Sequence, residues 1–322
     1  MAEVYCYGHV STGRVLRIKG GYPEADSYAE VIETLENHAG EATGTALVLR
    51  QLGVSVALEG NWIGDNPECR RTLKFLRKRG IDCSGLRVVA GYPGATELVI
   101  SDGTSRTVFG RYIDLLFTTK QWDDADPQKI AAARIACIDS TFGGSTLAAA
   151  RQAFTRGIPV VTFDPRHDSE LAARASAMII SGELIRREYP AAAANEDERA
   201  RLFETYRQHC PGLVVFTAGA RPIWWVRGAK PPGEPDHRSG LPAAGERHEQ
   251  PPFRVPVVDT AGAGDSFRAG IIYGMLQGWP DAESVRFAAA TAALICTRAP
   301  GCLHPPSLEE IRALLSAGRA QP

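Results

Sequence analysis

Helical segments that end at a glycine and lead at once into an apolar run recur along this chain. Such segments end at Gly53, Gly80 and Gly157, and the first and last lead into apolar runs at 54–58 and 158–163. Strands and helices that alternate at this length bury their apolar faces in a mostly parallel sheet with helices on both sides. The sequence therefore predicts an α/β fold, a three-layer, doubly wound, mostly parallel sheet.

Other segments continue this alternation. Strands are predicted at 4–7, 54–58, 135–139, 160–163, 177–180 and 213–217, and helices at 42–52, 67–79, 145–156, 168–175, 195–209 and 281–298. Two stretches have a different pattern of side chains. Residues 14–37 mix apolar and charged side chains and predict two or three exposed strands, while 95–111 predict a hairpin around Asp102-Gly103. Together they predict a small separate β-sheet.

Composition and charge narrow the class of protein. The chain has 322 residues and a net charge of −1, so bulk electrostatics favour neither a nucleic-acid nor a membrane partner. The sequence suggests neither a signal peptide nor a membrane span. Seven dispersed cysteines without a Cys-x-x-Cys pair predict reduced thiols, a cytoplasmic location and no metal site. Residues 228–252 are rich in Pro, Gly and charge, and predict a long polar loop.

The stretch 259–266, Asp-Thr-Ala-Gly-Ala-Gly-Asp-Ser, lies between an apolar run at 255–258, interpreted as a short strand, and a helical pattern that stops at Gly278. Glycines let a ligand approach the backbone, and a helix N-terminus offers free N–H groups and partial positive charge to a phosphate. Asp265 lies within this turn and could accept the proton of an attacking hydroxyl. From the residues alone, a phosphate-binding turn and a structural βα turn remain alternatives.

Two other glycine motifs fit less well. A dinucleotide fingerprint needs a third glycine where Phe267 stands, which disfavours an NAD-dependent dehydrogenase. A Walker A loop would end in Gly-Lys-Ser/Thr, and this turn does not.

The pattern Asp-Thr-x-Gly-Ala-Gly-Asp at 259–265 resembles the second signature of the ribokinase-like (PfkB) carbohydrate kinases at all its fixed positions. The resemblance implies that Asp265 is the catalytic base and that the amides of Gly262, Ala263 and Gly264 form an anion hole. It also implies a large nucleotide- and substrate-binding domain, 1–13, 38–94 and 112–322, with residues 14–37 and 95–111 as a β lid over the substrate.

The same resemblance extends to the sugar pocket. Residues 39–46 and 60–65 are similar to the first signature, with Gly40 at a close-approach position and Gly44 where the family usually has a sugar-binding Asn. Gly13 stands where the family has an Asp that holds sugar hydroxyls. An altered substrate is therefore expected. The predicted substrate-binding residues are Ser11, Gly13, Gly40, Glu41, Gly44 and Asp265.

Arg106 of the hairpin stands where the family often places an Arg that reaches the transferred phosphate, with Arg111 and Arg166 as alternatives. Ser181 and Glu183 lie where the family has an Asn-x-x-Glu magnesium motif, a variant similar to that of ketohexokinases. His9 is equally consistent with packing and with ligand contact. The predicted nucleotide-contacting residues are Ser181, Thr217, Gly219, Thr260, Gly262, Gly264, Ala292 and Cys296.

The resemblance thus implies ATP-dependent phosphorylation of a hydroxyl of a sugar or sugar-like molecule. ATP and Mg²⁺ are the expected cofactors, and a monovalent cation stays open. A homodimer through the lid is expected, with no nucleic acid and no membrane as partner. The alternatives are a kinase-fold protein that binds a ligand with little or no turnover, and a nucleoside kinase.

Overall fold

The structure is a computed structural model that describes residues 2–103, 105–228 and 246–318. Its main sheet has eight strands in the order β14-β13-β12-β11-β10-β9-β1-β4. Their bounds are β1 Val4–Gly8, β4 Val56–Gly60, β9 Ile135–Ile138, β10 Val160–Phe163, β11 Ala177–Ile180, β12 Leu213–Phe216, β13 Ile223–Arg227 and β14 His248–Gln250. All neighbours from β4 to β12 pair in parallel, and β13 and β14 are added antiparallel. This confirms the predicted α/β class.

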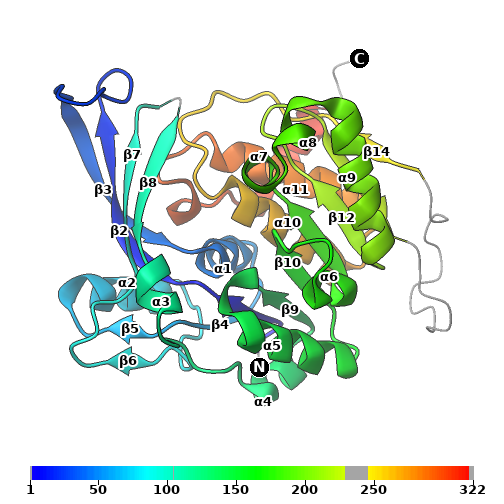
Figure 1. Cartoon of the computed structure of the whole chain (residues 1–322), viewed down its shortest axis with the longest axis horizontal. Helices are drawn as coiled ribbons and strands as arrows, with labels where there is room; N and C mark the ends of the chain where they lie inside the picture. The colour runs from blue at the N-terminus through cyan, green and yellow to red at the C-terminus, as the bar shows by residue number, and fades with distance from the viewer. Residues whose placement is uncertain (1, 104, 229–245, 319–322) are drawn as a thin grey trace.

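Helices cover both faces of this sheet (Figure 1). One face carries α1 Glu41–Gln51, α2 Pro67–Lys78, α10 Ala263–Gln277, α11 Asp281–Ile295 and α12 Leu308–Ala317. The other carries α4 Pro127–Ala132, α5 Gly143–Thr155, α6 Glu170–Arg174, α7 Gly182–Glu188, α8 Pro190–Ala194 and α9 Glu196–His209. Side-chain alternation along β1 divides the core, because Val4 and Cys6 pack under the first group while Tyr5 and Tyr7 pack under the second.

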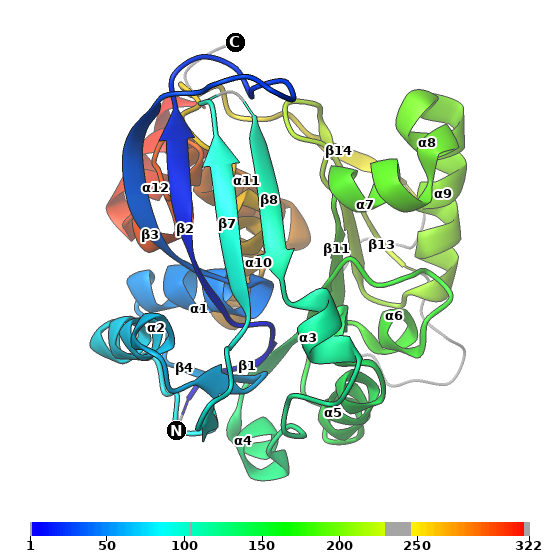
Figure 2. The same ribbon diagram turned by 60° about the vertical axis from the view of Figure 1, so that its left-hand side comes forward.

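A second sheet of four strands, in the order β3-β2-β7-β8, stands beside the main sheet (Figure 2). Its strands are β2 Ser11–Ile18, β3 Val31–Ala39, β7 Thr96–Ser101 and β8 Arg106–Arg111. Strand β2 begins before residue 14 and strand β3 ends after residue 37, so the two strands extend beyond both ends of the predicted segment 14–37. Helix α2 packs against this sheet at His38 of β3. The His38 ring lies 4.4 Å from the ring of Phe75, and its Nδ1 lies 2.8 Å from Thr72 Oγ1.

The remaining elements are short. They are β5 Ile63–Gly64, β6 Val88–Val89, α3 Ile113–Phe117 and the single 3₁₀ turns η1 Ser140–Phe142 and η2 Gly301–Leu303. In the described ranges, no helix is long and apolar enough to cross a bilayer.

Two sequence predictions are wrong. Residues 255–258 form no strand, because the N–H groups of Val258 and Asp259 both donate to the carbonyl of Cys296 at the end of α11 and no neighbouring strand pairs with this segment. The predicted polar loop 228–252 contains strand β14, which pairs with β13. Residues 229–245 of that loop lie outside the described residues.

Candidate active site

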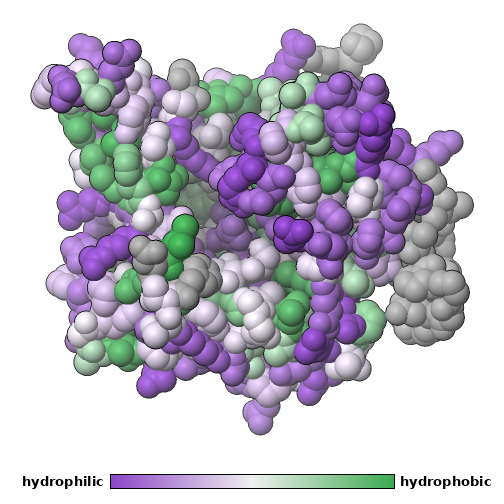
Figure 3. Space-filling model, in the orientation of Figure 1, coloured by the Kyte–Doolittle hydropathy of each residue, from purple (hydrophilic) through white to green (hydrophobic). Residues whose placement is uncertain are grey.

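One edge of the main sheet gathers the polar residues that follow its parallel strands. Asp139 follows β9, Asp164 follows β10, Ser181 follows β11 and Thr217 follows β12. Carboxyl ends of parallel strands share one edge, and this is where open α/β sheets bind ligands. In Figure 3 the surface is hollowed between the second sheet and the helices beside this edge.

The N-terminus of α10 offers free backbone donors at this edge. Its N-cap, Gly262, has a left-handed conformation with φ 76°, and no side chain caps the helix. The N–H of Ala263 reaches the carbonyl of Thr260 at 3.3 Å. The N–H groups of Gly262, Gly264 and Asp265 have no acceptor among the described residues. Unpaired donors at a helix start suit an anion, and here they belong to Gly262, Gly264 and Asp265.

Two glycines of this turn allow the helix to dock closely. A Cβ at Gly262 would lie 2.0 Å from Cys302 Sγ, and one at Gly264 would lie 2.7 Å from the Phe163 ring at the end of β10. A side chain at position 262 would clash with Cys302, and one at position 264 would push the helix start away from β10.

The carboxylate of Asp265 lies between α10 and α1. A Cβ at Gly44, in the first turns of α1, would be only 2.5 Å from Asp265 Oδ2. The Thr45 hydroxyl donates to the Asp265 carbonyl at 3.2 Å. Burial raises the pKa of Asp265 to about 7; Asp139 adds to the rise, while Arg268 and Arg106 oppose it. A carboxylate with a pKa near neutrality is well matched to accept a proton from a hydroxyl.

A fully buried ion pair holds the elements around this carboxylate. Arg268, one turn after Asp265 on α10, donates to Asp139 Oδ1 at 2.6 Å and to Thr45 Oγ1 at 2.9 Å. The other oxygen, Asp139 Oδ2, accepts the backbone N–H groups of His9 at 3.1 Å and Ala42 at 3.0 Å. The pair therefore links the ends of β1 and β9 with the starts of α1 and α10. Gly8 leaves room for it, because a Cβ there would lie 1.9 Å from Asp139 Oδ2.

The start of α1 makes the close approach predicted for Gly40. Gly40 is its N-cap with φ 110°, and a Cβ there would lie 2.0 Å from the carbonyl of His9. Glu41 follows in the first turn; burial and the carboxylates of Asp139, Asp265 and Asp164 raise its pKa, and Arg268 opposes the rise. The ring of His9 lies 4.6 Å from the ring of Tyr112, and burial lowers the pKa of His9 to about 4.

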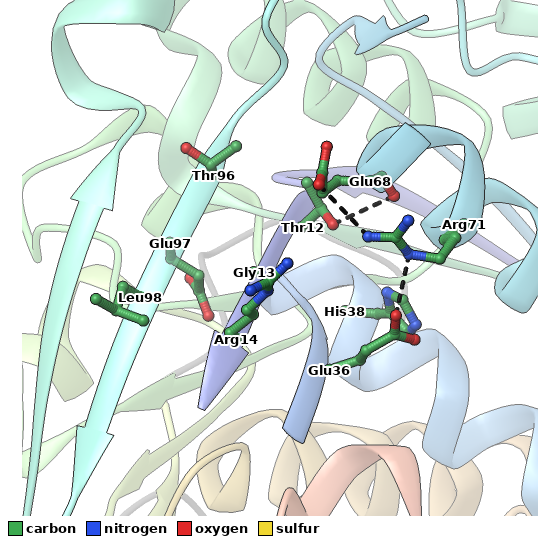
Figure 4. Close-up of a pocket in the computed structure, with 10 residues that line it drawn as sticks. All are labelled: Thr12, Gly13, Arg14, Glu36, His38, Glu68, Arg71, Thr96, Glu97 and Leu98. Atoms are coloured by element: carbon green, nitrogen blue, oxygen red, sulfur yellow. Dashed lines mark hydrogen bonds and ion pairs between the residues drawn. The ribbon is translucent and has the colours of Figure 1, made fainter. Parts of the chain in front are cut away.

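The second sheet contributes a carboxylate that the sequence prediction missed. Glu97 on β7 pairs in register with Gly13 on β2. Its Oε2 accepts the Ser11 hydroxyl at 3.3 Å and its Oε1 accepts the Asn37 side-chain amide at 2.7 Å. Burial raises the pKa of Glu97, and Arg106 opposes this. Figure 4 shows Glu97 extending from its strand toward the strand that carries Gly13.

Arg106 begins β8 opposite Ser101, on the same face of the second sheet as Glu97. Its side chain is exposed, and its positive charge opposes the rise in the pKa values of Asp265, Cys296 and Cys302. Arg106 therefore faces the α10 turn across the hollow. The alternative Arg111 lies on the opposite face, and Arg166 is paired with Asp168 at 3.1 Å.

Of the predicted nucleotide-contacting residues, Ser181, Thr217 and Gly219 follow strands β11 and β12 at this edge. Ser181 caps α7 by accepting the N–H of Leu184, and it donates to Asp164 Oδ2 at 2.7 Å. Thr217 donates to the carbonyl of Ile180 at 3.4 Å, and Gly219 has φ 60°. Of the others, Thr260 is exposed beside α10, Ala292 lies on α11 and Cys296 ends it.

Asp139, Arg268 and Glu97 had no predicted role. Asp139 closes an apolar strand, and Arg268 is a charge within the otherwise apolar face of α10, which was a usable signal. Glu97 alternates in register with the buried Val99, so its inward direction could have been read from the hairpin. Within the described part of the chain, no three His, Cys, Asp or Glu side chains are arranged to hold a metal ion.

Comparison with known proteins agrees with this geometry. The model of the pfkB family carbohydrate kinases matches residues 1–307. The ATP-dependent ribose-1-phosphate kinase of Halopiger xanaduensis is 27% identical over 317 residues, which cover 98% of this chain and 99% of the relative. The 5-dehydro-2-deoxygluconokinase of Shouchella clausii is 24% identical over 302 residues, covering 86% and 85%.

Among solved structures, a candidate ribokinase from Agrobacterium tumefaciens superimposes with a TM-score of 0.81 over 99% of each chain, at 24% identity. That likeness establishes a ribokinase-like fold. The match to the family model over nearly the whole chain establishes more: the chain belongs to the pfkB family of carbohydrate kinases and phosphorylates a sugar or sugar-like molecule with ATP.

Proposed function

We propose that Asp265 is the general base of this phosphoryl transfer. The carboxylate stands at the start of α10, at the strand-end edge of the main sheet, and its raised pKa suits proton transfer near neutral pH. In the proposed step the acceptor hydroxyl gives its proton to Asp265, and its oxygen attacks the γ-phosphorus of ATP while the bond to the β-phosphate oxygen breaks. ADP leaves, and the phosphate ester remains on the acceptor.

The free N–H groups of Gly262, Gly264 and Asp265 would hold the transferred phosphoryl group. Backbone donors aimed at an anion require no rearrangement during the reaction, so they stabilise developing charge efficiently. Arg106 would add positive charge from the second sheet, which then acts as a lid over the acceptor. This division of the chain into a large domain and a β lid is part of the proposal.

ATP would lie along the edge lined by Ser181, Thr217, Gly219 and Cys296. Mg²⁺ would supply charge neutralisation to its phosphates, and the donor set fits this, because Asp164 at the end of β10 and Glu183 in the first turn of α7 are neighbouring carboxylates. These two residues would hold the ion. Burial raises the pKa of Asp164 to about 6, with Glu183 contributing, so a cation here would also relieve repulsion between them.

The acceptor is proposed to be a sugar with an anionic group or another modification. Gly13 and Gly44 supply no side chain to grip a plain sugar, and the relatives named above act on ribose 1-phosphate and on 5-dehydro-2-deoxygluconate. The ketohexokinase-like variant at Ser181 and Glu183 makes a keto sugar a further candidate acceptor.

A direct test is an ATP-dependent transfer assay with ribose 1-phosphate, 5-dehydro-2-deoxygluconate, ribose, fructose and adenosine. ADP release and phosphorus NMR of the product would both be followed. We expect stoichiometric phosphorylation of at least one sugar. Binding of a sugar without ADP release would favour the ligand-binding alternative, and transfer to adenosine alone would favour a nucleoside kinase.

We also propose that two copies associate through the outer face of the second sheet. Register places Phe109, Leu98 and Leu16 on this face, and Phe109 is 50% exposed. Figure 3 shows apolar surface over these strands. An exposed apolar patch of this kind marks an interaction surface. Sedimentation of wild type and of Phe109→Glu tests it, since the variant should shift toward monomer.

A further inference from the structure

Glu97 is a half-buried carboxylate that forms no ion pair within the described residues, and it contributes to the lining of a pocket (Figure 4). No Lys, Arg or His forms an ion pair with Glu97 anywhere in the described ranges, and only Ser11 and Asn37 donate to it. A carboxylate has about four acceptor positions, so acceptor capacity remains on both oxygens. Burying a charge with few partners costs stability, and such a group is retained when something else binds it.

The backbone is built around this side chain. In the parallel pair of β2 and β7, a Cβ at Gly13 would lie 2.1 Å from the Glu97 carbonyl and 2.8 Å from Glu97 Cγ. Residue 13 therefore has to be glycine for Glu97 to lie across β2. Ser11 on β2 and Asn37 on β3, the next strand beyond it, then fix both carboxylate oxygens.

This carboxylate faces the proposed catalytic centre. Ser11 pairs in register with Ala39, and Gly40 and Glu41 follow directly as the start of α1, whose Gly44 lies against Asp265. On the sheet side, Arg106 shares the face of Glu97. The charge of Glu97 is close enough to contribute to the raised pKa of Asp265 and to that of Tyr112.

We propose that Glu97 is a specificity-determining residue that accepts hydrogen bonds from hydroxyl groups of the acceptor sugar. This inference rests on the proposed sugar kinase function. Position 13 on β2 lacks a carboxylate, and Glu97 supplies one from β7. The hydroxyl groups of the sugar would therefore be bound by a side chain from a different strand. A hydrogen bond from a neutral hydroxyl to a charged carboxylate is stronger than a hydrogen bond between two neutral groups.

The test compares Glu97→Gln with Glu36→Gln. Glu36 is the matched control, since it lies on β3 with its side chain on the opposite face and pairs with Arg71 at 3.0 Å. Thermal unfolding of both variants checks that they fold. KM and kcat are measured with the sugars ribose 1-phosphate, 5-dehydro-2-deoxygluconate, ribose and fructose, and with monodeoxy analogues of whichever sugar is phosphorylated.

We expect Glu97→Gln to raise KM by roughly 10- to 100-fold with a smaller change in kcat, because a hydrogen bond to a charged group is weakened. Glu36→Gln should stay within twofold. One monodeoxy sugar should show the same KM with wild type and with Glu97→Gln, because the partner of Glu97 is already missing. A kcat/KM within twofold of wild type for Glu97→Gln on every sugar would overturn the assignment.

Failure of the kinase proposal is separable from failure of this one. If wild type phosphorylates none of these sugars, the same four are titrated by calorimetry in the presence of a non-hydrolysable ATP analogue. A sugar bound by wild type and lost in Glu97→Gln supports the role of Glu97 without turnover. Equal binding by both proteins, or no binding by wild type, overturns it.

Discussion

Gly44 of α1 lies against the carboxylate of Asp265, so closely that a Cβ at position 44 would be 2.5 Å from Oδ2 and 2.9 Å from Cγ. The position thus needs glycine for a reason unrelated to backbone dihedrals, because its φ is helical. Gly44→Ala should displace the Asp265 carboxylate and lower kcat by about 100-fold, since misplacing a catalytic group by about 1 Å costs this much.

Gly144→Ala is the matched control for this substitution. Gly144 is also a helical glycine, in α5, and a Cβ there would meet nothing within 4 Å. Its kcat should equal that of wild type. Equal activity of Gly44→Ala and Gly144→Ala would show that the carboxylate does not need its present position.

The pH dependence of kcat/KM should report the ionisation of Asp265. A general base works in its deprotonated form, and burial raises the pKa of Asp265 to about 7. Activity should therefore be nearly constant above pH 8 and fall about tenfold for each pH unit below 6. A profile that stays flat down to pH 5 would contradict the assignment of this residue as base.

Arg106→Gln should alter both the rate and this profile. The positive charge of Arg106 opposes the rise in the pKa of Asp265, so its removal should move the acid limb to higher pH. Loss of a charge that faces the transferred phosphate should also lower kcat by roughly 10- to 1000-fold. Arg111→Gln, on the same strand but the opposite face, serves as control. Identical profiles for the two variants would count against Arg106.

The Asp139–Arg268 pair should behave as a coupled unit in stability measurements. Both side chains are fully buried, so Arg268→Met or Asp139→Asn alone should cost about 3–5 kcal/mol of unfolding free energy. The double variant should lose less than the sum of the two, by at least about 1 kcal/mol. Urea unfolding of the four proteins measures this. Additive losses would mean that the two residues act independently.

The sequence located the turn at 259–265 at the start of a helix because this pattern is local. Asp265 and its glycines lie within one turn of helix, and the strand-helix alternation that positions them is visible as apolar periodicity. The predicted strand at 255–258 failed for a non-local reason. This segment looks like a strand in isolation, yet its N–H groups find the end of α11, which is some 40 residues away in sequence.

The sugar pocket was only half predictable. Compared with the family motifs, Gly13 and Gly44 each lack the side chain that binds the sugar. In three dimensions Gly13 makes room for Glu97 and Gly44 makes room for Asp265. The contacts that explain them join residues more than 80 positions apart, such as Ser11 with Glu97 and Thr45 with Asp265, and no local pattern encodes those.

The central claim is that Asp265 removes the proton of the acceptor, and Asp265→Asn tests it most directly. The variant keeps the shape of the side chain and removes its basicity. It should fold, and it should be at least as stable as wild type at pH 8. A carboxylate with a raised pKa loses its stability contribution as pH rises through about 7, and asparagine avoids this loss.

The decisive measurement is kcat for phosphorylation of the sugar on which wild type is most active, at pH 8 and with saturating ATP. We predict a fall of about 10²- to 10⁴-fold for Asp265→Asn, with ATP binding retained. A kcat within tenfold of wild type would contradict the account.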